Sequence, residues 1–409
     1  MNRKEFIKLG SLTSVAFFAT YSGVNATIDI LPSKAAHPLA ITMWDFSWLE
    51  RRWAGGGYED WDKILDELVE RGYNAVRIDA YPHLLGASPD KEWTLKPVWD
   101  QNDWGSPGLI KVKIQPALIE FIAKCDKRNV KVALSTWYRE DEDNTRMQID
   151  SPEKMAANWL KVLDIIDAEK LLDAILYVDM CNEWPAKIWT PYFKAERKNH
   201  DWSIPSSVAW MKTSLSIMRK NYPQLPFTFS FDHYEKGILK NNPIPYLDFI
   251  EQHLWMASLQ NGEFNNKLGI DWDGFSTGDY KKLVAKAEAI YTQDKAYWDD
   301  ILVSSIKQLA DDAKAAGQPL ITTESWALVN YKDYPMLNWH WIKELCELGV
   351  RKAAETQQWV AIATSNFCGP QFKGMWNDIA WHQRLTSMIK KSKISDDLKD
   401  KKIVLRLNN

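Results

Sequence analysis

Short apolar segments and longer amphipathic segments alternate along most of the chain. Each short segment is nearly continuously apolar, whereas apolar residues in the longer segments recur every three or four positions. The first pattern is typical of buried strands and the second of helices with one buried face. We therefore expect eight strands, at residues 39–44, 74–80, 130–137, 174–182, 226–233, 246–255, 318–326 and 359–367.

Helices are expected between these strands, and one of them has a recognisable start. Ser151 precedes Pro152, which is the arrangement of an N-cap followed by proline at the first helical position. The amphipathic segments predict helices at residues 58–72, 116–129, 152–167, 206–223, 301–317 and 339–357. Apolar strands that alternate with helices favour a parallel sheet, and eight of them favour a single (β/α)8 TIM barrel.

The two ends of the chain differ from this pattern. Residues 1–26 have a basic start, then a short apolar run, then small residues at Val24-Asn25-Ala26. This order is typical of a bacterial signal peptide, so we expect export to the periplasm or the cell exterior and a single domain at 27–409. No later window is apolar enough to predict a transmembrane helix. The charged end, residues 394–409, contains "KKIVLRL", which could add one edge strand.

Composition narrows the functional classes. The formal net charge is −3 without a basic stripe, which argues against nucleic acid as a partner. The four cysteines are scattered, so we expect buried thiols. The seven histidines form neither an HxH nor an HExxH pattern, and we predict no metal and no cofactor. The 22 tryptophans suit a protein that stacks indole rings on carbohydrate. The oligomeric state is left open.

Two glutamates stand at predicted strand ends, where TIM barrels carry their chemistry. Glu183 follows the fourth strand in "LYVDMCNEWP", and Glu324 ends the seventh in "ITTESW". Two carboxyl groups facing each other about 5–5.5 Å apart are what a retaining glycoside hydrolase needs. One protonates the leaving oxygen, and the other attacks the anomeric carbon. The alternative is that both are ion-paired acids of the barrel wall.

These strand-end motifs resemble the superfamily of retaining, cellulase-like glycoside hydrolases with a TIM barrel. The resemblance implies that Glu183 is the acid/base and Glu324 the nucleophile. It also implies that Asn182 binds the sugar 2-hydroxyl and that Arg77, in "AVRIDA", orients the nucleophile. For Arg77 a salt bridge to Asp79 or to another barrel acid is the alternative.

The resemblance is partial at the sixth and eighth strands. His253 matches a family histidine, but Trp255 stands where the family usually has tyrosine. A tryptophan after the eighth strand usually forms the floor of the subsite where the sugar is cleaved. Trp376 is our candidate and Trp381 its rival. His253 as a core histidine and Trp376 as a packing residue are the alternatives.

Chemistry and resemblance together predict an exported enzyme that cleaves oligo- or polysaccharide. An apolar wall such as Trp184 is expected to keep Glu183 protonated. Five tryptophans at or near strand ends are expected to line the cleft: Trp44, Trp137, Trp255, Trp326 and Trp376. The competing hypotheses are a catalytically inactive, carbohydrate-binding barrel and a metal hydrolase. The intact glutamate pair disfavours the first, and the missing histidine cage disfavours the second.

Overall fold

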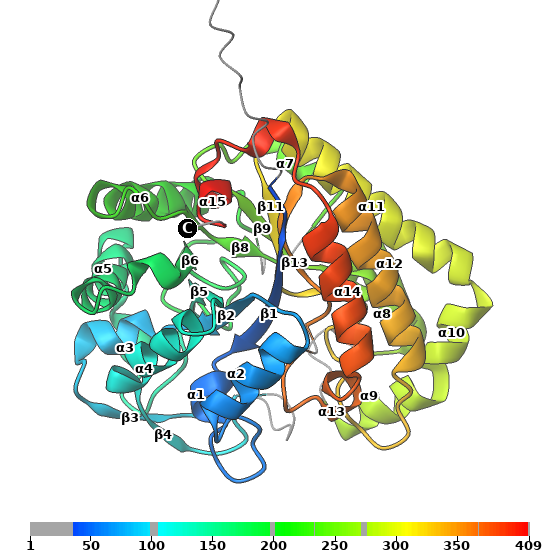
Figure 1. Cartoon of the computed structure of the whole chain (residues 1–409), viewed down its shortest axis with the longest axis horizontal. Coiled ribbons are helices and arrows are strands. Elements are labelled where there is room, and N and C mark those ends of the chain that lie inside the picture. The colour runs from blue at the N-terminus through cyan, green and yellow to red at the C-terminus, as the bar shows by residue number, and fades with distance from the viewer. Residues whose placement is uncertain are drawn as a thin grey trace, which may run out of the picture. The chain divides into compact units, whose positions relative to one another are not determined.

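A nearly closed barrel of parallel strands forms the centre of the molecule (Figure 1). The computed structural model describes residues 36–98, 105–196, 201–232, 234–270, 276–366 and 368–407. The predicted signal peptide and its boundary at residue 26 lie outside these residues. The strands are β1 (Leu39–Asp45), β2 (Ala75–Asp79), β5 (Lys131–Ser135), β6 (Ile175–Asp179), β7 (Phe227–Thr228), β8 (Ser230–Phe231), β9 (Ile250–Gln252), β11 (Leu320–Thr322) and β13 (Trp359–Ala363).

The order of these strands confirms the predicted TIM barrel. They are hydrogen-bonded in the order β7-β6-β5-β2-β1-β13-β11-β9-β8, and every neighbouring pair is parallel. Only Phe229 separates β7 from β8, so these two are halves of one barrel strand. One half pairs with β6 and the other with β9. The eight predicted strands therefore all exist, and together they form a nearly closed ring.

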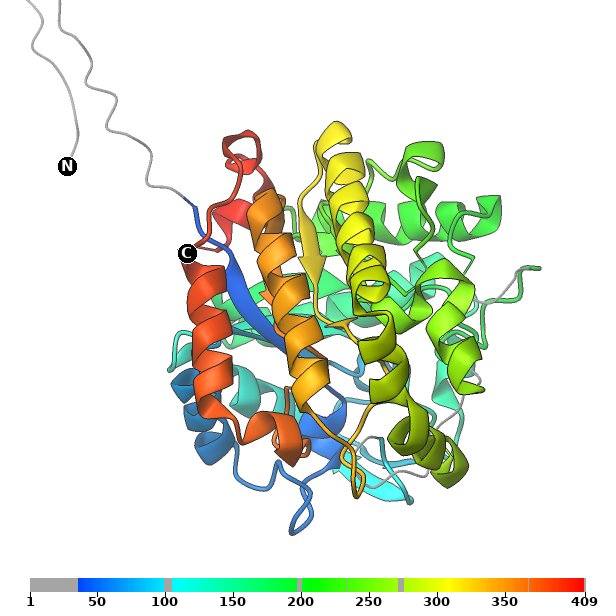
Figure 2. The ribbon, with the colours of Figure 1, turned by 90° about the vertical axis from the view of Figure 1, so that its right-hand side faces the viewer.

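Helices follow the strands and cover the outside of the barrel (Figures 1 and 2). They are α2 (Trp61–Glu70), α4 (Ile114–Asp126), α5 (Pro152–Ala168), α6 (Pro205–Asn221), the short α7 (Ile238–Asn241), α11 (Lys295–Ala315), α12 (His340–Thr356) and α14 (Ile379–Lys391). In α5 the Ser151 side chain accepts from the backbone N–H of Lys154, as the N-cap pattern predicts. In α2 the residues Trp61, Ile64, Leu65 and Leu68 are buried, which is one face of the helix.

The connections after the strands carry further elements that the apolar pattern did not resolve. A hairpin of β3 (Glu92–Leu95) and β4 (Ile110–Lys113) lies in the segment between β2 and α4. The predicted insertion before α11 holds α8 (Leu259–Leu268), α9 (Thr277–Lys282) and α10 (Glu288–Gln293). Shorter elements are α1 (Ser47–Glu50), α3 (Pro82–Ala87), α13 (Lys373–Trp376) and the parallel pair β10 (Leu254–Trp255) and β12 (Ser325–Trp326).

The C-terminal segment closes the end of the barrel where the strands begin. We expected an edge strand in "KKIVLRL", but these residues form the helix α15 (Lys402–Leu405), so that expectation is wrong. Ile403 and Val404 are buried in one apolar cluster with residues at the starts of the barrel strands, among them Leu39 of β1 and Ala75 of β2. Nη2 of Arg406 donates to the carbonyl oxygen of Ile175 at 2.6 Å. Figure 2 shows this segment beside the start of β1, at the opposite end from the β3–β4 hairpin.

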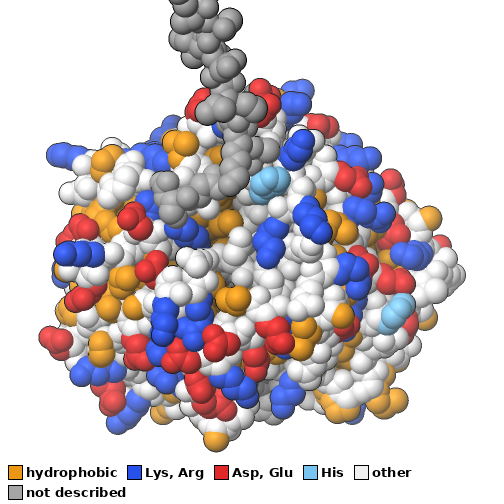
Figure 3. All heavy atoms as spheres, in the orientation of Figure 1, with side chains coloured by type: hydrophobic (Ala, Val, Ile, Leu, Met, Phe, Trp, Pro, Cys, Tyr) orange, Lys and Arg blue, Asp and Glu red, His pale blue; other side chains and the backbone are white. Residues whose placement is uncertain are grey.

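The surface and the thiols agree with the composition. On the face shown in Figure 3, Lys and Arg side chains are interspersed with Asp and Glu. The four cysteines are buried free thiols, as predicted: Cys125, Cys181, Cys346 and Cys368. Among the described residues, no helix combines the length and the apolar character needed to cross a membrane.

Candidate active site

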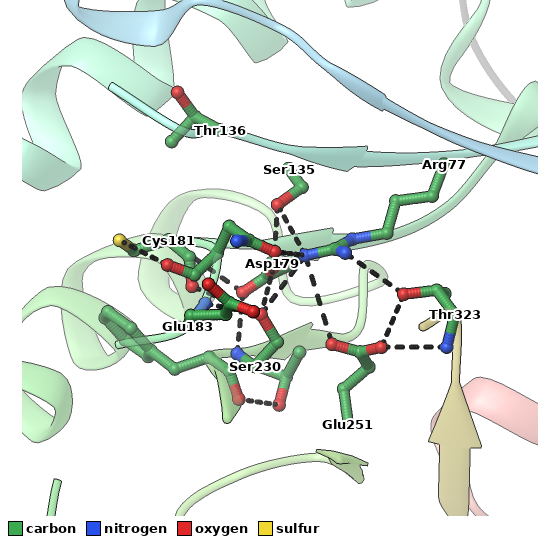
Figure 4. Close-up of polar contacts among 12 residues, drawn as sticks. Arg77, Ser135, Thr136, Asp179, Cys181, Glu183, Ser230, Glu251 and Thr323 are labelled. Atoms are coloured by element: carbon green, nitrogen blue, oxygen red, sulfur yellow. Dashed lines mark hydrogen bonds and ion pairs between the residues drawn. The ribbon is translucent and has the colours of Figure 1, made fainter. Parts of the chain in front are cut away.

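Arg77 lies at the centre of a buried polar cluster inside the barrel (Figure 4). Its Nη1 donates to Oε1 of Glu324 at 3.1 Å and to Oγ1 of Thr323 at 3.0 Å. Its Nη2 donates to Oδ2 of Asp179 at 2.6 Å and to Oδ1 of Asn182 at 2.7 Å. Because the guanidinium is planar and rigid, one side chain of β2 sets the positions of groups from β6 and from the turn after β11.

Asp179 is the buried carboxylate that pairs most closely with Arg77. Its Oδ2 also accepts from Oγ of Ser135 at 2.7 Å and from Oγ of Ser230 at 2.9 Å. Its Oδ1 accepts from the backbone N–H of Ser230 at 2.9 Å. Arg77 therefore makes both predicted contacts. It forms a salt bridge to a barrel acid, which is Asp179, and it also contacts Glu324. Asp79 instead accepts from backbone N–H groups.

Glu183 lies four residues beyond the end of β6 with its side chain 16% exposed. Its Oε1 is 3.1 Å from Nδ1 of His253, and its Oε2 accepts from Nε1 of Trp189 at 3.1 Å. The backbone N–H of Glu183 donates to Oγ of Ser230 at 3.0 Å. Glu183 has φ of 51°, in the left-handed region that costs a non-glycine residue about 1 kcal/mol. Such conformations concentrate at functional sites.

The structure brings Glu183 and Glu324 together with His253 between them. One oxygen of each carboxylate and one nitrogen of His253 all lie within 4.8 Å of one another. Nε2 of His253 is 3.7 Å from Oε1 of Glu324. The distance between the oxygens of Glu183 and Glu324, at most 4.8 Å, is close to that of a retaining carboxylate pair. It is well below the 6.5–9.5 Å of an inverting pair, which has to hold a water molecule between the groups.

Glu251 is a fully buried carboxylate on β9 that the sequence analysis missed. Its Oε1 accepts from the backbone N–H of Thr323 at 3.1 Å and from Oγ1 of Thr323 at 2.7 Å. Its Oε2 is 3.2 Å from Nε2 of His253 and 3.9 Å from Nη2 of Arg77. The signal was present in the sequence, because alternate residues of a strand share one face and Glu251 stands two positions before His253.

Charges inside the barrel shift the pKa values of these groups strongly. Burial raises the pKa of Glu324 to about 7, although His253 and Arg77 oppose this shift. Burial also opposes ionisation of Glu251, but His253 and Arg77 lower the pKa of that carboxyl to about 2. Burial alone would lower the pKa of His253, whereas the carboxylates of Glu324 and Glu251 raise it well above its ordinary value. Strong shifts of this kind in one cluster are typical of catalytic sites.

The trio of Glu183, His253 and Glu324 could be considered as ligands for a metal ion, because each offers a donor atom. The contacts of these donor atoms do not fit that role. Oε1 of Glu324 already faces the Arg77 guanidinium at 3.1 Å, and a divalent cation there would stand against a fixed positive charge. His253 lies close to a carboxylate with both ring nitrogens, which favours protonated nitrogens over metal-ligating ones. We therefore assign no metal to this trio.

The predicted tryptophans divide into two groups. Trp137 lies beside the cluster, with the Arg77 guanidinium 4.8 Å from its ring centroid. Trp255 packs edge-on to His253, with ring centroids 5.5 Å apart. Its indole Nε1 is buried and has no hydrogen-bond partner among the described residues, so it does not replace the tyrosine hydroxyl. The other three pack into the barrel wall: Trp44, Trp326 and Trp376.

Contacts of these three explain their position. Nε1 of Trp44 donates to the carbonyl oxygen of Cys368 at 3.0 Å, and Nε1 of Trp326 to that of Ala363 at 2.9 Å. The ring of Trp376 lies under the Arg71 guanidinium, 4.1 Å from it, and its Nε1 donates to Glu67 of α2 at 2.9 Å. A surface cavity of about 440 Å³ lies beside Trp376, but neither Glu183 nor Glu324 lines it. None of these contacts joins the three tryptophans to the glutamate pair.

Two further expectations about aromatic residues changed. Trp381, the rival of Trp376, packs on His382 in α14, with ring centroids 4.9 Å apart. Trp184, expected as the apolar wall of Glu183, instead donates from Nε1 to Ser207 of α6 and packs against Trp210 of the same helix. The indole that contacts Glu183 is Trp189, which lies in the loop after β6 and which sequence reasoning did not single out.

This is a parallel barrel with two carboxylates, an arginine and a histidine close together beyond its strand ends. These features are typical of the TIM-barrel glycoside hydrolases. A family model described as "Cellulase-like: Sugar-binding cellulase-like" matches residues 41–390. The chain belongs to this Cellulase-like family of glycoside hydrolases, as the resemblance implied.

Solved structures agree with this assignment. A protein from Parabacteroides distasonis, whose name as a glycoside hydrolase is provisional, is 50% identical, with a TM-score of 0.89 over 91% of this chain and 99% of its own. An endocellulase from the archaeon Pyrococcus horikoshii is 13% identical, with a TM-score of 0.51 over 86% and 92%. An endo-β-1,4-mannanase from Thermotoga petrophila is 10% identical, with a TM-score of 0.50 over 88% and 78%. The last two show the fold alone. No curated protein matches the sequence.

Proposed function

We propose that the protein is an exported β-glycoside hydrolase that cleaves oligo- or polysaccharide with retention of anomeric configuration. The observation that carries the proposal is the approach of Glu183 and Glu324, with one oxygen of each within 4.8 Å. The two carboxylates follow different strands, β6 and β11, and face each other at the mouth of a barrel of the Cellulase-like family. This spacing suits direct attack by one carboxylate better than a water molecule held between two.

The contacts of the two glutamates support a division of labour. Two ionised carboxylates at this distance repel each other, so the pair tends to hold one proton between them. Burial raises the pKa of Glu324 to about 7, but His253 and the Arg77 guanidinium, 3.1 Å away, oppose that shift, and we assign the shared proton to Glu183. In the first step Glu324 attacks the anomeric carbon while Glu183 protonates the leaving oxygen. In the second step Glu183 takes a proton from water, and that water replaces Glu324 at the anomeric carbon.

Neighbouring side chains support this scheme. Asn182 accepts from Arg77 through Oδ1, which fixes its amide and leaves Nδ2 to bind the sugar 2-hydroxyl, the role that the family resemblance implies. Trp137 and Trp255 adjoin the cluster but are only 2% exposed each, so they form the apolar wall behind the site and do not offer open faces to a sugar. His253 contacts Glu183 directly. Arg77 acts as a positioning residue that orients Glu324.

A pair of alanine variants tests the proposal. Glu183→Ala should slow substrates with poor leaving groups far more than aryl glycosides, whose phenolate leaves unaided. Azide should then restore turnover and yield a glycosyl azide with the original anomeric configuration. Glu324→Ala should abolish cleavage of both kinds of substrate, because no covalent intermediate can form. Azide there should yield only the inverted azide.

The measurement is product analysis by ¹H NMR over a broad panel of β-linked oligosaccharides and nitrophenyl glycosides. The matched control is Glu140→Ala, a loop carboxylate that pairs with Lys96 at 2.7 Å and with Arg146 at 2.6 Å. This control should keep wild-type activity. Swapped outcomes for the two glutamates would reverse their roles, and tight sugar binding without turnover in the wild type would instead identify an inactive carbohydrate-binding barrel.

Export is a separate part of the proposal and rests on the sequence of residues 1–26. Expression of the full chain in a bacterial host should yield a periplasmic or secreted protein whose N-terminus is Thr27. A mature protein that keeps Met1 and remains in the cytoplasm would refute this part alone.

A further inference from the structure

The imidazole of His253 lies between an exposed carboxylate and a buried one. Its Nδ1 is 3.1 Å from Oε1 of Glu183, and its Nε2 is 3.2 Å from Oε2 of Glu251. The Glu183 side chain is 16% exposed, whereas the side chains of His253 and Glu251 are completely buried. Of these three side chains only Glu183 is open to a substrate, and His253 is the group that links Glu251 to Glu183.

Glu251 is held in place independently of His253. Its other oxygen, Oε1, accepts both from the backbone N–H of Thr323 at 3.1 Å and from the Thr323 hydroxyl at 2.7 Å. These two hydrogen bonds fix the carboxylate in one orientation, with Oε2 turned to the imidazole. Oε2 lies 3.2 Å from Nε2 of His253, which is an ion-pair distance. A carboxylate can only accept, so a proton on this side of the imidazole is carried by Nε2.

We propose that Glu251 is a positioning residue, which keeps a proton on Nε2 of His253 so that Nδ1 of His253 and Glu183 share the acid proton of the site. This inference rests on the proposed function, because it assigns a partner to the acid/base. Figure 4 shows Glu251 among the polar groups around Arg77, on the inner face of the barrel.

The proton balance of the double displacement follows from this arrangement. In the first step Glu324 bonds to the anomeric carbon while the bond from that carbon to the leaving oxygen breaks, and the shared proton moves from the Glu183–His253 pair to that oxygen. In the second step water gives one proton back to the pair, its oxygen bonds to the anomeric carbon, and the ester bond to Glu324 breaks. Nε2 keeps its proton throughout, and the site returns to its starting state.

Every charged group that faces His253 contributes to its protonation. Glu183, Glu251 and Glu324 face the imidazole from the ends of β6, β9 and β11, and the cation Arg77 lies 3.9 Å from Glu251. Asp179 pairs with Arg77 at 2.6 Å and offsets its charge. The negative groups outnumber the positive ones, which agrees with the raised pKa of His253. Of the three facing carboxylates, only Glu251 has no bond-forming role in the mechanism.

The test compares Glu251→Gln with Asp79→Asn. Both substitutions replace a fully buried carboxyl group by an amide, but Asp79 accepts from the backbone N–H groups of Tyr81 and Trp137 and, within the part of the chain that the structure describes, forms no hydrogen bond or ion pair with His253. The assay is the pH profile of kcat/KM on a nitrophenyl glycoside that the wild type cleaves. In Glu251→Gln the alkaline limb should move to lower pH by about one pH unit or more, because a negative charge beside the imidazole is lost. In Asp79→Asn that limb should stay in place.

Leaving-group dependence separates this role from a merely structural one. Glu251→Gln should lose more kcat on an alkyl glycoside than on the nitrophenyl glycoside, since only the alkyl leaving group needs its proton. Equal losses on both substrates, or an alkaline limb that moves equally in both variants, would overturn the inference. If Glu183→Ala and Glu324→Ala behave as proposed while Glu251→Gln keeps the wild-type profile, the inference alone fails.

A measurement on the wild-type protein covers the case in which Glu251→Gln does not fold. With ¹⁵N-labelled histidine, the two ring nitrogens of His253 are resolved by NMR and assigned from the signals lost in His253→Gln. Nδ1 should titrate together with the alkaline limb, and Nε2 should remain protonated across it. A deprotonated Nε2 on that limb would refute the role of Glu251.

Discussion

Neutralising Asp179 tests the energetics of the cluster without removing a group that touches the substrate. In Asp179→Asn the shape of the side chain is kept, but one acceptor oxygen becomes an NH₂ group. If that group takes the place of Oδ2, it faces the Arg77 donor at 2.6 Å. If it takes the place of Oδ1, it faces the backbone N–H of Ser230, which donates there at 2.9 Å. Either way a buried donor loses its acceptor.

The expected loss is about 3 kcal/mol in the free energy of unfolding. Breaking a buried ion pair by removing one partner costs about 3–5 kcal/mol. Two features favour the lower end of this range. Arg77 keeps Glu324 at 3.1 Å and Glu251 at 3.9 Å as counter-charges. Burial also raises the pKa of Asp179, so neutralising the carboxyl relieves part of its desolvation cost.

The matched control is Asp143→Asn. Asp143 pairs with Lys91 at 2.6 Å, the same distance as Asp179 to Arg77, but the side chains of that pair are 67% and 42% exposed. An exposed pair is worth about 1 kcal/mol or less. Urea unfolding of wild type and both variants, followed by circular dichroism with a common m-value, gives the two losses. If Asp179→Asn proves no more destabilising than Asp143→Asn, burial is not what gives this pair its strength.

Three shorter predictions follow from other contacts. Burial lowers the pKa of His83 to about 4 and that of His382 to about 3. Each histidine should therefore destabilise the fold by about 1.4 kcal/mol per pH unit as the pH falls from 6.5 to 4. Between pH 7 and pH 4.5, His83→Gln should lose less of its free energy of unfolding than the wild type does. Trp189→Phe removes the N–H donor to Oε2 of Glu183 and should lower kcat about tenfold with little change in KM, which steady-state kinetics would measure. Activity should survive dialysis against EDTA, whereas inactivation that Zn²⁺ or Ca²⁺ reverses would contradict the assignment of no metal.

The sequence was informative about the barrel because strand and helix patterns are local. Continuous apolar runs of four to eight residues identify strands whatever their partners, and eight of them imply closure. The residues at the strand ends then converge on one mouth by geometry. For that reason Arg77, Glu183, His253 and Glu324 could be grouped from positions far apart in the chain, and the structure does bring them together.

Orientation across a strand was harder to predict than position along it. Trp44 and Trp326 stand at strand ends as expected, but their side chains point out of the barrel and donate to backbone carbonyls in its wall. A tryptophan is large enough to pack well on either side, so residue type gives no signal. Contacts made by loops carry still less pattern. Trp189 reaches Glu183 only because the loop after β6 folds back, and no periodicity in the sequence marks that turn.

The closure of the barrel by α15 has a consequence for synthesis. Ile403 and Val404 of α15 complete the apolar interior at the end where β1 begins, and Arg406 caps the carbonyl oxygen of Ile175. This segment is translated after every strand that it covers. Until it has been made and has docked, the eight strands have no lid over their starting ends, and apolar groups there stay open to water. The strands alone therefore cannot complete the native barrel.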